Sequence, residues 1–164
     1  MTEIDLTNPK GAIFSDDRKY RYALWRVWRS SWPLLMVIGL NPSTADEVVD
    51  DPTIVRCEYR AMNGGFGGLL MGNLFALVST NPAELLLNSE SVGEYNNHYL
   101  ECMMNLSSTQ LCAWGSFAPV KNRSRDVLKT IKNPYCLGIN KDGNPKHPLY
   151  IAYRVDMKPY QVTL

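Results

Sequence analysis

The feature that most constrains the fold is an apolar run at residues 34–40, LLMVIGL, which ends abruptly in Asn41-Pro42-Ser43. An uninterrupted apolar run bounded by turn residues is typical of a strand buried on both faces of a parallel sheet. Gly39 lets the backbone turn sharply, and the Asn-Pro pair holds the Asn41 amide in a fixed pose beyond the strand. Ligands of open α/β sheets bind beyond the carboxyl ends of the strands, so this turn is the first candidate for a functional site.

The rest of the chain alternates strand-like and helix-like segments. Asp51-Pro52 is typical of a helix start and Asn63-Gly64 of a helix end. Further strands are predicted at 68–77, 110–115 and 135–140, and further helices at 82–87, 94–106 and 118–132. Strands that alternate with helices imply right-handed crossovers. We therefore predict an α/β fold of three αβα layers around a central four-stranded parallel sheet.

The N-terminal segment 1–33 is predicted to be an arm followed by a helix, within a single domain of 1–164. Residues 1–17 have no periodic pattern, whereas in 18–32 the apolar residues recur at helical spacing with the arginines largely away from them. Such a helix could place tryptophans on bases and arginines on phosphates. The alternative is that the tryptophans pack on the sheet.

Composition narrows the class of protein. A chain of 164 residues with 45% hydrophobic content suits one domain with a real core. No apolar run reaches the roughly 18 residues of a membrane span, and no signal peptide is recognisable. The four cysteines form no C-x-x-C pair, so we expect no metal or other cofactor and a reduced, cytoplasmic location. We also expect a monomer without a membrane partner.

Charge is unevenly distributed, although the net charge is only +1. Residues 119–164 hold nine Lys/Arg against three acids, whereas residues 34–118 hold two against nine. Binding of a phosphate backbone needs a local basic surface rather than a high total charge. The C-terminal third could supply this surface, or its basic residues could be ordinary solvated side chains.

Three later segments complete an ordered set of motifs with the Asn41 turn: GNLFALVST (72–80), CAWGSFA (112–118) and NPKHPLY (144–150). In this order the motifs resemble those of the uracil-DNA glycosylase superfamily. That superfamily has a Gly-x-Asp/Asn-Pro loop, an Asn at the end of the next strand, a W/L-G-x-x-A segment and a His-Pro loop. At closer range the chain resembles an uncharacterised bacterial and phage family, DUF1643-like, with the pattern NPSTAD…DDPT…NLFA…AWG…HPLY.

The resemblance implies a uracil-DNA glycosylase-like fold and a monofunctional DNA glycosylase that hydrolyses the N-glycosidic bond of a flipped-out base. Asn41 would orient the attacking water, because an amide is too weak a base to deprotonate it. Asn73 would read the Watson–Crick edge of a pyrimidine, and His147 would donate to the base oxygen as negative charge develops. The further substrate-binding candidates are Gly39, Leu40, Pro42, Ser43, Asp46, Asp51 and Phe75. The DNA-binding candidates are Ser116, Lys121, Arg123, Arg125, Lys141 and Lys146.

Two departures from the superfamily pattern bear on the substrate. Leu149 replaces the serine of a His-Pro-Ser loop that in relatives helps to hold a backbone phosphate. The aromatic residue that relatives stack on the base is not evident, and only Tyr59 and Phe66 are loose candidates. A wider and more polar pocket favours a bulkier, modified pyrimidine that Asp46 or Asp51 could hydrogen-bond. Modified bases occur in phage DNA, which leaves a role in phage defence open.

Two other functions remain open from the sequence. The acids Asp46, Glu47, Asp50 and Asp51 could serve a Mg²⁺-dependent phosphohydrolase or nuclease, because hard cations take carboxylate oxygens. Alternatively, the chain could be a catalytically silent nucleic-acid-binding module that kept the fold and lost the chemistry. Asn41 and Asn73 could also be structural, the first by bonding its own turn and the second by tying strand to loop.

Overall fold

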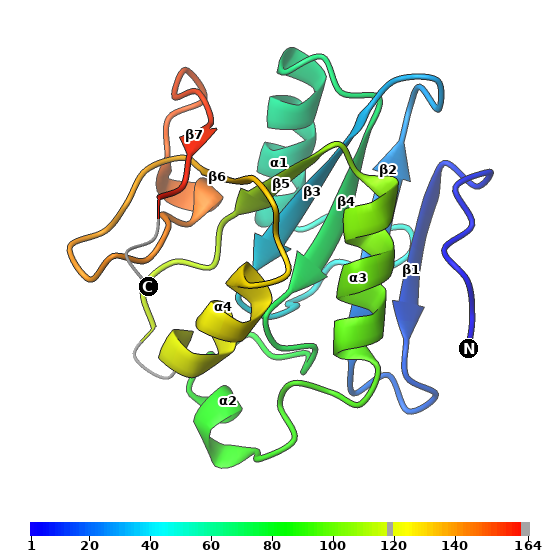
Figure 1. The fold of residues 1–164 in the computed structure, drawn as a ribbon. Helices are drawn as coiled ribbons and strands as arrows, with labels where there is room; N and C mark the ends of the chain where they lie inside the picture. The colour runs from blue at the N-terminus through cyan, green and yellow to red at the C-terminus, as the bar shows by residue number, and fades with distance from the viewer. Residues whose placement is uncertain (118–119, 162–164) are drawn as a thin grey trace.

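The computed structural model describes residues 1–117 and 120–161, without the side chains of residues 120 and 121. One mixed sheet of seven strands, in the order β1-β2-β4-β3-β5-β6-β7, forms its centre (Figure 1). The strands are β1 (Lys10–Phe14), β2 (Arg21–Val27), β3 (Leu34–Gly39), β4 (Gly68–Asn73), β5 (Thr109–Cys112), β6 (Pro134–Cys136) and β7 (Lys158–Pro159).

The predicted four-stranded parallel sheet is therefore incomplete as a description. β3 pairs in parallel with β4 and β5, and β5 pairs in parallel with β6. Antiparallel strands extend this parallel part on both sides: β1 and β2 next to β4, and β7 next to β6. Because β3, β4, β5 and β6 run in the same direction, the loops that follow them emerge at one edge of the sheet.

Helices cover both faces of the sheet in three layers (Figure 1). The helices are α1 (Pro52–Asn63), α2 (Glu84–Leu87), α3 (Asn96–Leu106) and α4 (Val120–Leu128), with a short 3-10 turn, η1 (Pro148–Tyr150). On one face Ile54, Cys57 and Ala61 of α1 pack on the sheet. On the other face Leu100 and Met103 of α3 lie in a second apolar core that also includes residues of α4. No helix in the described ranges is long and apolar enough to cross a membrane.

The start and end of α1 follow the predicted signals. The Asp51 side chain accepts a hydrogen bond from the Ile54 backbone N–H at 2.9 Å, Pro52 occupies the first turn, and the helix ends at Asn63 before Gly64. Within α1, Arg60 donates to the carbonyl oxygens of Ile151 (2.8 Å) and Val155 (2.9 Å). The helix therefore also anchors the segment that follows η1.

The predicted N-terminal helix is wrong, and a strand interrupts the predicted arm after residue 9. Residues 10–14 form β1 and residues 21–27 form β2, which pairs with β1 and β4. The segment RYALWRV is buried throughout, and aromatic residues favour strands as readily as helices when a neighbouring strand is available. Arg21 and Arg26 consequently lie inside the protein rather than on a DNA-binding helix.

Candidate functional site

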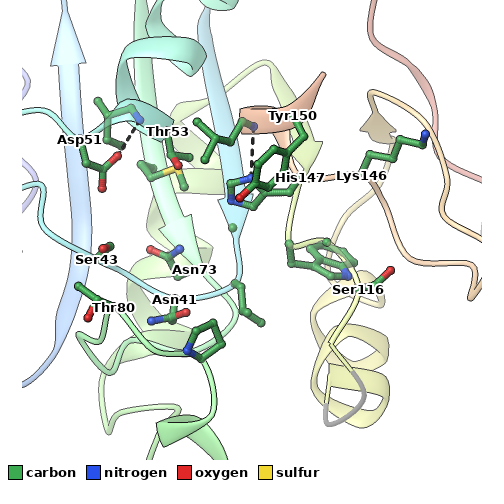
Figure 2. A pocket seen from close by; sticks show the side chains of 18 of the residues that line it. Asn41, Ser43, Asp51, Thr53, Asn73, Thr80, Ser116, Lys146, His147 and Tyr150 are labelled. Atoms are coloured by element: carbon green, nitrogen blue, oxygen red, sulfur yellow. Dashed lines mark hydrogen bonds between the residues drawn. The ribbon is translucent and has the colours of Figure 1, made fainter. Parts of the chain in front are cut away.

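A cavity of about 710 Å³ lies at the carboxyl ends of β3, β4 and β5. The loops after these strands, the start of α1 and the η1 turn supply its walls (Figure 2). Of the predicted site residues, the ones that line the cavity are Gly39, Leu40, Asn41, Ser43, Asp51, Asn73, Ser116, Lys146 and His147. The structure thus brings Asn41 and His147 together in one cleft, although they are far apart in the sequence.

Asn41 has a fixed amide. Its Nδ2 donates to the carbonyl oxygens of Ser79 (2.8 Å) and Pro42 (3.0 Å), which fixes the side-chain orientation. The amide oxygen receives no hydrogen bond from the described residues and is the acceptor that this side chain offers to the cavity. Asn41 is therefore both a structural tie between two loops and a positioned acceptor.

Asn73 ends β4 and is buried in the wall of the cavity. Its backbone oxygen accepts from Nδ2 of Asn96 at 3.0 Å, so α3 holds the end of the strand in place. Its side-chain Oδ1 accepts from Nη2 of Arg21 at 3.4 Å. Gly39 lies opposite it, and a Cβ at Gly39 would approach Asn73 Nδ2 to 2.8 Å. The absence of a side chain at Gly39 therefore makes room for the Asn73 amide.

Arg21 is a site residue that the sequence analysis did not identify. It lines the cavity from β2 and is only 3% exposed. Burial lowers the pKa of its guanidinium to about 10, with Asp51 acting in the opposite direction, so Arg21 still carries its charge at neutral pH. We did not identify Arg21 from the sequence because we expected residues 18–32 to be a helix whose arginines lie away from its tryptophans.

His147 is held with a defined donor toward the cavity. Its Nδ1 accepts from the Leu149 backbone N–H at 3.2 Å within η1. In the neutral ring the hydrogen is then on Nε2, the other nitrogen. Burial lowers the pKa of His147 below its ordinary value of 6.5, and the carboxylate of Asp51 opposes this shift. His147 is thus a neutral hydrogen-bond donor at neutral pH.

The four acids that suggested a magnesium site have separate partners. Asp46 accepts from the backbone N–H groups of Val48 and Val49, and Asp51 caps α1. Glu47 pairs with Arg18, and Asp50 pairs with Arg26 and Lys10. Within the ranges that the structure describes, no group of three or more His, Cys, Asp or Glu side chains could hold a metal ion.

Three predicted substrate-binding residues do not line the cavity. Pro42 contributes its carbonyl oxygen to loop hydrogen bonds from Ser79 and Asn41. Asp46 is occupied by its own turn, as described above. Phe75 is buried in the apolar core on the α3 face, because its backbone continues into the interior after Asn73.

Arg123, Arg125 and Lys141, which we predicted to bind DNA, do not line the cavity. Arg123 is turned inward, where its Nε donates to the Leu74 carbonyl oxygen at 2.7 Å and burial lowers its pKa. It supports the loop after β4 rather than the mouth of the cavity.

Arg125 and Lys141 are exposed but do not line the cavity. The side chain of Lys121 lies outside the described residues. Lys146 and Ser116 remain as candidates for contacts to DNA.

Two aromatic residues of the cavity were not singled out from the sequence. Tyr150 is 82% exposed and its ring centre lies 6.0 Å from that of His147 (Figure 2). Trp114 also lines the cavity but is 2% exposed, and its indole N–H donates to Asn144. Only Tyr150 is free to meet a ligand with its face. Tyr150 is the last residue of the HPLY motif, so its place in a motif could have identified it from the sequence.

Comparison with known proteins identifies the family but no activity. No curated protein and no solved structure matches the chain significantly. Residues 21–149 match the model of a family described as "Protein of unknown function (DUF1643)". This match covers most of the chain, including Arg21 at its start and His147 near its end. The chain therefore belongs to the DUF1643 family.

Proposed function

We propose that this protein is a monofunctional DNA glycosylase that hydrolyses the N-glycosidic bond of a flipped-out, modified pyrimidine. The observation that carries the proposal is the fixed hydrogen-bonding polarity of Asn41 and His147 in one cavity. Asn41 offers an acceptor, because its Nδ2 is taken up by backbone carbonyls. His147 offers a donor, because its Nδ1 is taken up by the Leu149 N–H.

Hydrolysis of an N-glycosidic bond needs this pair of groups. The C1′–N bond breaks with its electrons on the base, which leaves a cation-like sugar and an anionic base. A water that donates a hydrogen bond to Asn41 Oδ1 attacks C1′. Its oxygen becomes the hydroxyl group of the sugar, and its proton passes to solvent or to the departing base. A neutral Nε2–H of His147 stabilises the negative charge that develops on a base oxygen. A protonated imidazole is not needed for this role.

The surroundings suit a nucleotide that has left the base stack. A cavity of about 710 Å³ has room for a substituted nucleoside. The exposed Tyr150 beside it offers an aromatic face for a base or for the gap left by the flipped nucleotide. Lys146 extends away from Asn41 in Figure 2, so water is a better nucleophile in this account than the lysine amine.

The width and polarity of the cavity support a modified base over plain uracil. Ser43, Asp51 and Thr80 line it in addition to Asn41 and Asn73 (Figure 2). A base with a polar substituent would hydrogen-bond these side chains, whereas a small base would leave them solvated. The fold proposed with this function is a uracil-DNA glycosylase-like one, and a place in phage defence would follow from the occurrence of such bases in phage DNA.

The test uses the purified protein and DNAs that carry different modified pyrimidines, including phage DNA with natural modifications. Alkali-labile strand breaks report abasic sites, and each reaction is run in EDTA and, in parallel, with Mg²⁺. We expect base release in chelator by the wild type and a loss of about 100-fold or more in Asn41→Ala and His147→Ala. Arg125→Gln, a change on the exposed face of α4, is the matched control and should keep the wild-type rate.

Other outcomes separate the alternatives. DNA binding without abasic sites on any substrate would identify a silent binding module. Activity that EDTA abolishes and Mg²⁺ restores would identify a metal-dependent phosphohydrolase or nuclease. A covalent protein–DNA adduct trapped by borohydride, and lost in Lys146→Gln, would replace water by that lysine as the nucleophile.

A further inference from the structure

Two arginines of β2 are almost fully buried, and they are satisfied very differently. Arg26 pairs with the Asp50 carboxylate at 2.7 Å and also donates to the carbonyl oxygens of Trp25 (2.8 Å) and Asp46 (2.7 Å). Arg21 makes one short bond, from Nη1 to the Ala45 carbonyl oxygen at 2.8 Å, and the longer one to Asn73. Arg26 therefore has the partners of a structural buried cation, and Arg21 does not.

The Arg21 guanidinium is left with unused donors in the wall of the cavity. Its Nε is buried without a hydrogen-bond partner among the residues that the structure describes. No carboxylate of the described residues lies within ion-pair distance of it. A buried charge without a counter-ion costs free energy, so its persistence in a pocket points to a role there.

The contact with Asn73 gives Arg21 a specific effect. An asparagine amide can present either its oxygen or its nitrogen by rotating half a turn, but a guanidinium has donors only. Rotation of Asn73 would bring Nδ2 against the donors of Arg21. Arg21 therefore keeps Oδ1 on its own side. Asn73 Nδ2 then lies toward Gly39 and, in Figure 2, toward the side of the cavity that holds His147. This nitrogen makes no hydrogen bond within the described part of the chain.

We propose that Arg21 is the specificity-determining residue of this cavity, where it fixes the Asn73 amide so that a donor faces the ligand. The base edge that Asn73 reads must then present an oxygen rather than an amino group. The cavity would accept a 4-oxo pyrimidine and reject its 4-amino counterpart, because an amino group would meet the Asn73 donor. This inference rests on the proposed function and names the selection made by the same site.

The experiment measures binding alone. Two single-stranded oligonucleotides differ only in one nucleotide, 2′-fluoroarabinouridine or 2′-fluoroarabinocytidine, whose fluorine suppresses hydrolysis. Dissociation constants are measured for the wild type, Arg21→Gln and Arg21→Lys, with Arg125→Gln as the surface control. The melting temperature and circular dichroism spectrum of each variant report whether it folds.

We expect the wild type and Arg125→Gln to bind the oxo strand at least about tenfold more tightly than the amino strand, because a mispaired buried donor is costly. Arg21→Gln should bring the ratio near one, since a glutamine amide can offer either a donor or an acceptor to Asn73. Arg21→Lys keeps a donor and should keep part of the preference. Should Arg21→Gln not fold, a partial loss of preference must appear in folded Arg21→Lys.

Two results overturn the inference. A ratio near one in the wild type would mean that Asn73 is not fixed. An unchanged ratio in folded Arg21 variants would mean that another group selects the base. Absence of binding to either strand would also overturn the inference, because no base edge would then be selected. Failure of the proposed function is distinguishable from this, because it would appear as the absence of base release from every modified DNA.

Discussion

At the scale of single residues, the site is built from side chains whose orientation is set by a second hydrogen bond. Asn41 and His147 are each held by backbone groups, and Asn73 is held by Arg21. The order of the motifs pointed to Asn41, Asn73 and His147 as site residues, because the motifs follow the predicted strands of a parallel sheet. Their polarity could not be predicted from sequence, because it depends on contacts between residues as distant as Arg21 and Asn73.

The pH dependence of base release tests the state of His147. Because burial lowers its pKa below 6.5, the ring stays neutral and the rate should remain flat as the pH falls through that value. The rate should decrease only at lower pH, where a proton on Nδ1 removes its hydrogen bond from the Leu149 N–H and the ring loses its fixed orientation. Asp51→Ser keeps a helix cap but removes the carboxylate that raises this pKa. The rate of base release by this variant should therefore begin to decrease at a still lower pH than that of the wild type. A wild-type rate that falls with a midpoint at 6.5 would contradict this assignment.

The same residue affects stability. His147 takes up a proton near pH 6.5 when unfolded but only at lower pH when folded, so the unfolded state binds more protons in between. The free energy of unfolding should decrease as the pH falls below 6.5, and less so in folded His147→Gln. Urea denaturation at several pH values measures both curves.

Tyr150 provides a further test at this scale. Its ring is exposed beside the cavity and contributes little to the core. Tyr150→Ala should therefore weaken DNA binding by about 1–3 kcal/mol, the usual value of a base-stacking contact, and leave the melting temperature unchanged. Tyr150→Phe, which keeps the ring, should bind as the wild type does. Equal binding by all three proteins would show that the ring does not touch DNA.

At the scale of elements, the predicted strands and helices were correct where the sequence pattern is compatible with one kind of secondary structure. The buried run at 34–40 became β3, and the Asp51-Pro52 signal became the start of α1. Segment 18–32 was misassigned because its tryptophans happen to recur at helical spacing. The neighbouring β4, which makes an extended conformation favourable there, is about 40 residues away in sequence. Local patterns do not contain that information.

Substitutions at two glycines test how closely the residue before β4 packs on the segment before β3. A Cβ at Gly67 would collide with the backbone oxygen of Arg29 and lie 2.6 Å from the Cβ of Trp32, whereas one at Gly65 would meet nothing. Gly67→Ala should therefore lower the free energy of unfolding by about 3 kcal/mol. Gly65→Ala, at a positive φ of 78°, should cost only about 1 kcal/mol. Comparable losses in urea denaturation would contradict the close contact at Gly67.

At the scale of the whole molecule, the alternation of strands and helices correctly predicted helices on both faces of a sheet. The charge distribution was a poorer guide. The C-terminal excess of Lys/Arg includes Arg123, which supports a loop, and Arg125, which is remote from the cavity lining. Linear charge density does not determine which side chains share a surface. Among the described side chains of that third, Lys146 is the one basic residue that lines the cavity.

Salt dependence of DNA binding tests this revised surface. Binding should weaken with added salt as counterions are released. Lys146→Gln should reduce the slope of log K against log salt by about 1 if it contacts one phosphate. Arg125→Gln should leave the slope unchanged. The reverse result would restore the basic face of α4 as the DNA-binding surface.

The central claim, hydrolytic release of a base without strand cleavage, is tested most directly by the intact mass of the DNA strand after reaction in EDTA. We predict a product whose mass equals that of the strand with the modified base replaced by a hydroxyl group, together with the free base. Asn41→Ala should leave the substrate mass unchanged. Strands that keep every base in the wild-type reaction, or fragments formed only when Mg²⁺ is added, would contradict the account.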